Sequence, residues 1–171
     1  MVGALAALLM SSVNPTAADV TAAQLPQLFE AACLDGEAKL APGSATPVTF
    51  DELPAELRQG LGKPSSAKIW RLNGSGRAFL YLLDYQPDRY TNPKICGLAS
   101  DGMDYASAAD AVEMRVTGQV SPKTMRTTEW LNAAGGYSAL ATTTGAFKVL
   151  QVNWLSETQR AEMQKAQSVI H

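Results

Sequence analysis

Histidine is almost absent from this chain, whose 171 residues include one, His171. A serine or cysteine nucleophile needs an adjacent base, and histidine most often supplies it. The sequence also lacks the G-x-S-x-G, HExxH and EF-hand patterns of common hydrolase, zinc and calcium sites. We therefore expect no metal site, no bound cofactor and no histidine-assisted nucleophilic catalysis.

Clusters of positive charge are missing as well. Lys and Arg total 14 against 16 Asp and Glu, which gives a formal net charge of −2 at pH 7. Nucleic-acid-binding surfaces need concentrated Lys and Arg, so we expect no nucleic-acid partner. No apolar run is long enough to span a bilayer in a mature protein.

Cysteine is scarce, with Cys33 and Cys96 as its two instances. Neither belongs to a CxxC pair and no histidine accompanies them, which argues against zinc and against a thioredoxin-type redox site. An even number of cysteines in an oxidising compartment favours a disulfide between the two. The alternative is a pair of buried free thiols.

The N-terminal segment indicates such a compartment. Residues 2–10, VGALAALLM, form an apolar block, and small and polar residues follow it up to the first charged residue, Asp19. This pattern is typical of the core and cleavage region of a secretory signal peptide, although no Lys or Arg precedes the block. The alternative is an ordinary buried helix.

Two cleavage positions fit the small residues that such a site needs. Residues 16–18, TAA, would place the cut before Asp19, and residues 21–23, TAA, are a second candidate. We expect a signal peptide over residues 1–18, a single domain over residues 19–171, and a periplasmic or secreted protein.

The stretch 68–85, KIWRLNGSGRAFLYLLDY, predicts a β-hairpin at the centre of the fold. Its apolar residues alternate with strand period on either side of an NGSG turn, where glycine supplies the positive φ angles. The second run is apolar on both faces, which favours a strand inside a sheet that is covered above and below. No helix follows the GSG tripeptide, so we interpret it as a turn rather than a phosphate loop.

The rest of the chain alternates helix and strand patterns. The sequence predicts a loop over 37–49, helices over 21–35, 51–60, 101–118 and 156–168, and further strands over 94–98, 124–130, 137–143 and 146–155. The order helix–helix–βββ–α–βββ–α favours an α+β fold, in which helices pack on an antiparallel sheet of about six strands. The two βββ blocks suggest a structural repeat without sequence identity. The apolar phase of the last strand switches at Val149-Leu150, which predicts a bulge.

The loop after the hairpin carries the candidate binding residues Tyr85, Asp88, Arg89 and Tyr90. Tyrosine and arginine are enriched at binding hot spots, so this cluster is a hypothetical contact surface for a ligand or protein. The alternative is a solvated loop in which Arg89 pairs with a neighbouring Asp.

Asp101 and Asp104 offer two carboxylates close together. Acid–base catalysis would require a pocket that raises the pKa of one of them. The alternative is a turn followed by a helix cap.

The chain resembles small exported proteins of Gram-negative bacteria that have no assigned activity. The likeness lies in the N-terminal apolar block, the helix-borne Cys33, the strand-borne Cys96 and the segment 51–62, DELPAELRQGLG. The resemblance implies a periplasmic location and assigns no functional residue.

Three functions remain open at this point. The first is a non-catalytic exported domain that binds a protein partner or an envelope component, and a flat exposed patch over a filled core would favour it. The second is a small-molecule-binding domain with a cleft between sheet and helices, which needs a deep apolar pocket with convergent polar groups. The third is a carboxylate-dependent hydrolase, which needs two acidic side chains facing each other in a cleft.

Overall fold

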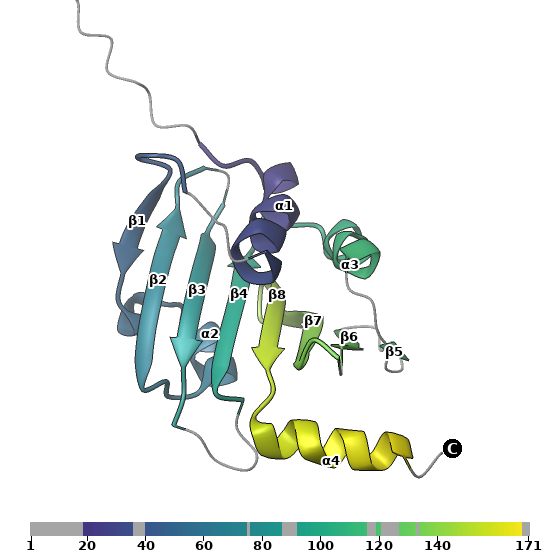
Figure 1. Ribbon diagram of the computed structural model, residues 1–171. Helices are drawn as coiled ribbons and strands as arrows, with labels where there is room; N and C mark the ends of the chain where they lie inside the picture. Colours follow the sequence, from purple (N-terminus) through teal and green to yellow (C-terminus); the bar gives the residue numbers. More distant parts are fainter. Residues whose placement is uncertain are drawn as a thin grey trace, which may run out of the picture.

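The computed structural model describes residues 19–35, 40–74, 76–86, 92–115, 119–120, 127–132 and 134–168. These residues form one eight-stranded sheet with helices packed on it, which confirms the expected α+β class (Figure 1). The expected signal peptide lies outside the described residues. Among the described helices, none has the length and apolar character to cross a membrane.

All neighbouring strands of the sheet are antiparallel, in the order β1-β2-β3-β4-β8-β7-β6-β5. The strands are β1 Ala45–Val48, β2 Ser66–Leu72, β3 Ala78–Asp84, β4 Lys94–Ser100, β5 Gln119–Val120, β6 Thr127–Asn132, β7 Tyr137–Thr144 and β8 Phe147–Trp154. The α-helices are α1 Leu25–Phe29, α2 Ala55–Leu61, α3 Tyr105–Arg115 and α4 Glu157–Ser168. The 3-10 turns η1 Ala22–Gln24 and η3 Phe50–Glu52 and the π-helical turn η2 Glu30–Leu34 complete the elements.

The sheet consists of two halves of four strands, where the sequence suggested two blocks of three in a sheet of about six. Strands β1 to β4 and β5 to β8 each run in order across their half, with α1 before the first set and α3 before the second. The halves join where β4 pairs with β8. This arrangement brings α1 and α3 to the same side of the sheet (Figure 1).

The sheet buries apolar side chains on both faces, as the central hairpin predicted. Leu80 of β3 faces the core that α1, η2 and α3 cover, whereas Phe79 and Leu83 of the same strand face the core beneath α2. The expected bulge at Val149-Leu150 is wrong, because β8 pairs without interruption with both β4 and β7. The apolar residues of β8 fall on both faces of the strand, because Val149 faces the core beneath α2 and Leu150 faces the core that α1 and α3 cover.

A disulfide fastens the first helical segment to the middle of the sheet. Cys33 in η2 bonds to Cys96 in β4, with 5.4 Å between their Cα atoms and a separation of 63 positions in sequence. Both side chains are buried. The bond confirms the predicted pairing, and it is compatible with an oxidising compartment.

Side-chain caps form at two of the expected helix starts, and α2 begins later than expected. Gln24 and Gln159 accept hydrogen bonds from the backbone N–H of Thr21 and Ser156, at 2.8 and 2.7 Å. The expected helix start at residue 51 is wrong, because Thr49 and Glu52 cap η3 and α2 begins only after Pro54. Helix α2 then ends at Gly62, whose φ of 68° suits glycine, and not at Gly60.

The expected loop over 37–49 contains β1, an edge strand of the sheet. The backbone N–H of Asn73 donates to the carbonyl oxygen of Ser44 at 2.8 Å, which sets the hydrogen-bonding phase of the β1–β2 pair. By the alternation of an antiparallel ladder, Pro47 lies at a position whose nitrogen points away from β2. Proline is tolerated there because no ladder hydrogen bond is lost.

Candidate functional site

Tyr85 is the member of the predicted contact cluster that the structure describes. Its hydroxyl donates a hydrogen bond to the carbonyl oxygen of Leu61 at 2.6 Å, and burial raises the pKa of Tyr85 to about 12. It lines a hollow of about 520 Å³ with Lys63, Ser65 and other residues of the segment after α2. Asp88, Arg89 and Tyr90 lie outside the described residues, so the cluster stays a prediction.

Asp101 and Asp104 make structural contacts. The Arg77 guanidinium binds Asp101 through Nε at 2.8 Å and, with the Arg77 backbone N–H, holds the pKa of that carboxyl below its usual value. The backbone N–H and hydroxyl of Ser107 both donate to Asp104 at 2.9 Å and lower its pKa likewise. Both groups are therefore ionised at neutral pH, whereas a general acid needs a raised pKa.

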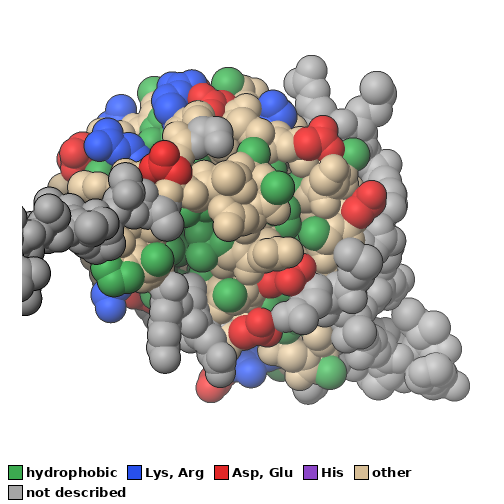
Figure 2. Space-filling model, turned by 90° about the horizontal axis from the view of Figure 1, so that it is seen from above, with side chains coloured by type: hydrophobic (Ala, Val, Ile, Leu, Met, Phe, Trp, Pro, Cys, Tyr) green, Lys and Arg blue, Asp and Glu red, His purple; other side chains and the backbone are tan. Residues whose placement is uncertain are grey.

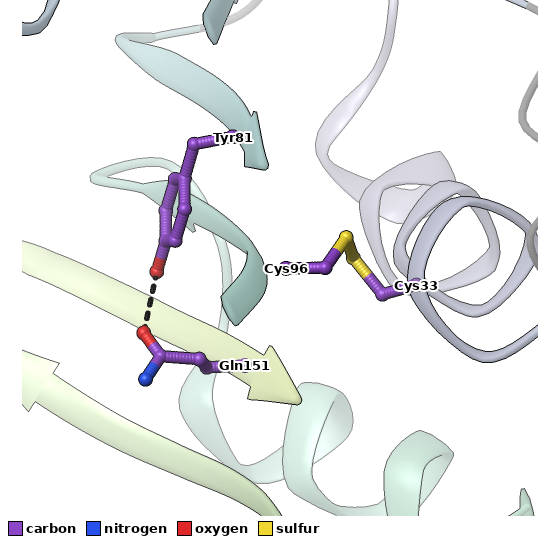
Figure 3. Close-up of a disulfide and its surroundings, with 4 residues drawn as sticks. All are labelled: Cys33, Tyr81, Cys96 and Gln151. Atoms are coloured by element: carbon purple, nitrogen blue, oxygen red, sulfur yellow. Dashed lines mark hydrogen bonds between the residues drawn. A yellow bond between two sulfur atoms is a disulfide. The ribbon is translucent and has the colours of Figure 1, made fainter. Parts of the chain in front are cut away.

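A chain of polar side chains crosses the face of the sheet that α2 partly covers. The Tyr81 hydroxyl donates to Gln151 Oε1 at 2.9 Å, and Gln151 Nε2 donates to Asn153 Oδ1 at 2.6 Å (Figure 3). Asn153 Nδ2 then reaches the Ser138 hydroxyl at 3.4 Å. Figure 3 shows Tyr81 and the disulfide pointing away from β3 and β4 in different directions, in agreement with their places in separate cores. The hollow beside this chain, between α2 and the sheet, measures about 150 Å³.

A second hollow lies on the other face, between the first helical segment and α3. It has a volume of about 760 Å³. We call it the helix groove; its lining residues are Ala22, Ala23, Pro26, Gln27, Glu30, Gly102, Met103, Asp104, Ser107, Ala108 and Ala111. The groove exists because the repeated topology sets α1 and α3 side by side on one face of the sheet (Figure 1).

The helix groove has an apolar floor and a polar rim. Met103 and Ala108 are buried at its base, while Gln27, Asp104 and Ser107 are exposed at its margin. Among the described side chains, the charged residues that line it are Glu30 and Asp104, both acidic. Figure 2 looks at the molecule from above and shows hydrophobic side chains near the middle of the view, acidic side chains both there and at the edge, and Lys and Arg side chains at the edge.

Sequence reasoning did not identify the helix groove, because its two walls are far apart in the chain. The sequence predicted the helix over 101–118, and Ala108 and Ala111 of that helix line the groove. On the other wall, the alanines of residues 22–23 were interpreted only as part of a candidate cleavage motif.

Within the described ranges, no three His, Cys, Asp or Glu side chains gather closely enough to hold a metal ion. Comparison of the chain with models of protein families, with curated proteins and with solved structures found no match.

Proposed function

We propose that this protein is an exported, non-catalytic domain that binds a protein partner or an envelope component in the helix groove. The observation that carries the proposal is the groove itself: an apolar hollow between the first helical segment and α3, with its polar groups at the rim. Helical grooves with apolar floors are a recurrent way to bind a segment of another protein.

The distribution of polar groups favours a macromolecular segment over a small molecule. A small-molecule site needs a few polar groups that converge inside a largely enclosed pocket. The hydroxyl of Ser107 in the groove is engaged with Asp104, and the buried floor residues are apolar. The hollow beneath α2 does have convergent polar groups at Tyr81 and Gln151, but about 150 Å³ is below the range of roughly 300–1,000 Å³ for typical ligand pockets.

The contacts of the first described residues support cleavage before Asp19. The Val20 backbone N–H donates to the Asn73 carbonyl oxygen at 2.7 Å, and Thr21 donates to Gln24 at the start of η1. A cut after Ala23 would remove both contacts, whereas a cut before Asp19 keeps them. The buried disulfide also suits an oxidising compartment.

Site-specific photocrosslinking in cells tests the binding function. We would place benzoylphenylalanine at Ala23 and at Ala111, on opposite walls of the groove, and at the exposed Glu129 of β6 as the control. The proposal expects the same macromolecular adduct at both groove positions and none at the control.

Two results would contradict the proposal. Equal crosslinking at Glu129, or none at either groove position, would remove the groove as the binding surface. A co-purifying small molecule, seen by native mass spectrometry and displaced by the bulky residue at Ala111, would favour the small-molecule alternative. Export is tested separately: N-terminal sequencing of the protein from the periplasm or medium should begin at Asp19.

A further inference from the structure

The small hollow beneath α2 has the features of a second binding site, on the face of the sheet opposite the helix groove. We call it the α2 hollow; it lies between residues 57–61 of α2 and the strands β3, β7 and β8. We propose that the α2 hollow binds a neutral molecule of about the size of phenol, which donates one hydrogen bond to Tyr81 or Gln151. This site is separate from the helix groove and does not depend on the proposed function.

The volume of the α2 hollow sets the size of the ligand. Its volume of about 150 Å³ is below that of typical ligand pockets, yet an apolar protein cavity of about 150 Å³ binds benzene. The side chains of Leu57 and Val149 are buried at its base, and Leu61 and Leu140 are half-buried. A six-membered ring would therefore find apolar contacts from both the helix and the sheet, and the hollow is open to solvent on the side of the half-buried residues.

Two polar side chains converge on the hollow and present acceptors to it. Tyr81 is 1% exposed, and its hydroxyl donates to Gln151 Oε1 at 2.9 Å. The bond from Gln151 Nε2 to Asn153 Oδ1, at 2.6 Å, fixes the orientation of the Gln151 amide. Burial raises the pKa of Tyr81, so its hydroxyl keeps its proton and uses it in the bond to Gln151.

The two converging oxygens each keep a lone pair for a further donor. A hydroxyl oxygen and an amide carbonyl oxygen can each accept two hydrogen bonds. Among the described residues, no side chain or backbone group gives a second donor to the oxygen of Tyr81 or of Gln151. A ligand O–H or N–H group would pair with one of them, and pairing a buried acceptor is favourable.

The lining of the hollow disfavours charged ligands. The described residues that line it are all uncharged. An ionised molecule would lose its hydration there without gaining an opposite charge, which is costly. The ligand class is therefore a small neutral ring that carries one hydrogen-bond donor.

Phenol and toluene are matched probes for this inference, because they have nearly the same shape and differ in a hydroxyl against a methyl group. Phenol is neutral at pH 7, since a phenolic hydroxyl titrates near about pH 10. A purely apolar cavity favours toluene, because the phenol hydroxyl must leave water. We expect the reverse here: phenol should bind the full chain with a Kd of about 1 mM or below, about threefold to tenfold more tightly than toluene.

Titrations followed by ¹H–¹⁵N NMR measure both affinities and locate the site. The shifts should centre on the backbone amides of Gly60, Leu140 and Gln151, which line the hollow. Toluene that binds as tightly as phenol, no shifts with phenol up to about 10 mM, or shifts centred on the helix groove would each overturn the inference. Benzoate that binds as tightly as phenol would overturn the neutral ligand class. These comparisons use the unmodified protein, so they decide even where a variant fails to fold.

A pair of phenylalanine variants tests whether the hollow itself is occupied. A Cβ atom added at the exposed Gly60 would lie 3.7 Å from the methyl group of Thr144, so a larger side chain there is directed across the hollow. Gly60→Phe should weaken phenol binding tenfold or more. Gln59→Phe, at the exposed neighbouring position outside the lining, should leave it unchanged. Equal loss in the two variants would place phenol elsewhere and overturn the inference.

The double variant Tyr81→Phe/Gln151→Leu tests the hydrogen bond. It removes both acceptors and keeps an aromatic ring and a side chain of similar size, so the hollow becomes purely apolar. Toluene should then be the tighter ligand. A preference for phenol that survives in the folded double variant would show that neither oxygen receives the ligand's donor, and this result would overturn the inference.

Discussion

The ring of Tyr81 lies directly over the Cα of Gly97 on the neighbouring strand. The two residues face each other across the β3–β4 pair, and a Cβ atom on Gly97 would overlap the Tyr81 ring and hydroxyl. The glycine thus makes room for a buried tyrosine whose hydroxyl begins the polar chain across the sheet.

Gly97→Ala should therefore destabilise the fold, because the added methyl group forces a buried ring to move. The expected loss is about 1–3 kcal/mol of unfolding free energy, measured by urea denaturation. Tyr81→Leu in the same background should reduce that loss, since the methyl group then meets no ring. Additive losses from the two substitutions would show that they do not interact.

Gly60→Ala should raise the stability of the fold, in contrast to Gly97→Ala. Gly60 is exposed within α2, and its added Cβ would meet only the Thr144 methyl group at an ordinary distance of 3.7 Å. Alanine favours a helix over glycine by about 0.5–1 kcal/mol, so the midpoint of urea unfolding should rise. A fall would mean that this stretch of α2 is held in a backbone geometry that alanine does not fit.

Tyr81→Phe should cost about 1–3 kcal/mol, although the ring is kept. It removes the donor to Gln151 Oε1 and leaves that half-buried acceptor without the tyrosine as its partner. The companion change Gln151→Leu in the Tyr81→Phe protein should recover part of the stability, because both ends of the hydrogen bond are then gone. Urea denaturation of both variants gives the comparison, and no recovery would indicate that Gln151 is needed for its bond to Asn153.

The Cys33–Cys96 bond should contribute about 4 kcal/mol to stability in the loop-entropy account, because it closes a loop across 63 residues of separation. A reductant should therefore lower the midpoint of urea unfolding strongly. A Cys33→Ala/Cys96→Ala protein should show a similar loss and no response to reductant. Two alkylatable thiols in protein isolated without reductant would contradict the bond.

Alkaline pH should unfold the protein through its buried tyrosines. Burial raises the pKa of Tyr85 to about 12 and raises that of Tyr81 further, whereas an unfolded tyrosine titrates near pH 10. The unfolded chain therefore releases these protons first, and stability that is complete below about pH 10 is lost as pH rises through about 12. Urea midpoints measured up to about pH 12 should fall, and less steeply in Tyr85→Phe. Native tyrosinate absorbance that rises in one step near pH 10 for all five tyrosines would contradict this prediction.

Local patterns predicted the parts of the fold that depend on neighbouring residues. The two apolar faces of residues 78–85 indicated a covered central strand, and the helical pattern over 156–168 predicted α4. The edge strand β1 was missed because it is four residues long and contains Pro47, which is typical of loops. The phase switch at Val149-Leu150 suggested a bulge because sequence alone does not show that both faces are covered.

The candidate site was beyond sequence reasoning for a different reason. The helix groove joins residues 22–30 to residues 102–111, and only the strand order brings those segments together. The polar chain at Tyr81 is only weakly indicated by the sequence, because Gln151 and Asn153 alternate with apolar residues in the second half of β8. Such residues are solvated in a half-exposed sheet and hydrogen-bonded in a covered one, and the pattern does not distinguish the two.

Pro47 in the edge strand β1 bears on the tendency of this protein to aggregate. An exposed strand at the border of a sheet is a template on which a second chain can add its own strand, the first step towards fibrous aggregates. With its ring nitrogen facing outwards, Pro47 offers an incoming strand no donor at that position, and β1 is too short to provide many others. Replacing Pro47 with valine would supply a backbone N–H donor at that position of the edge strand. The protein should then aggregate more readily at high concentration.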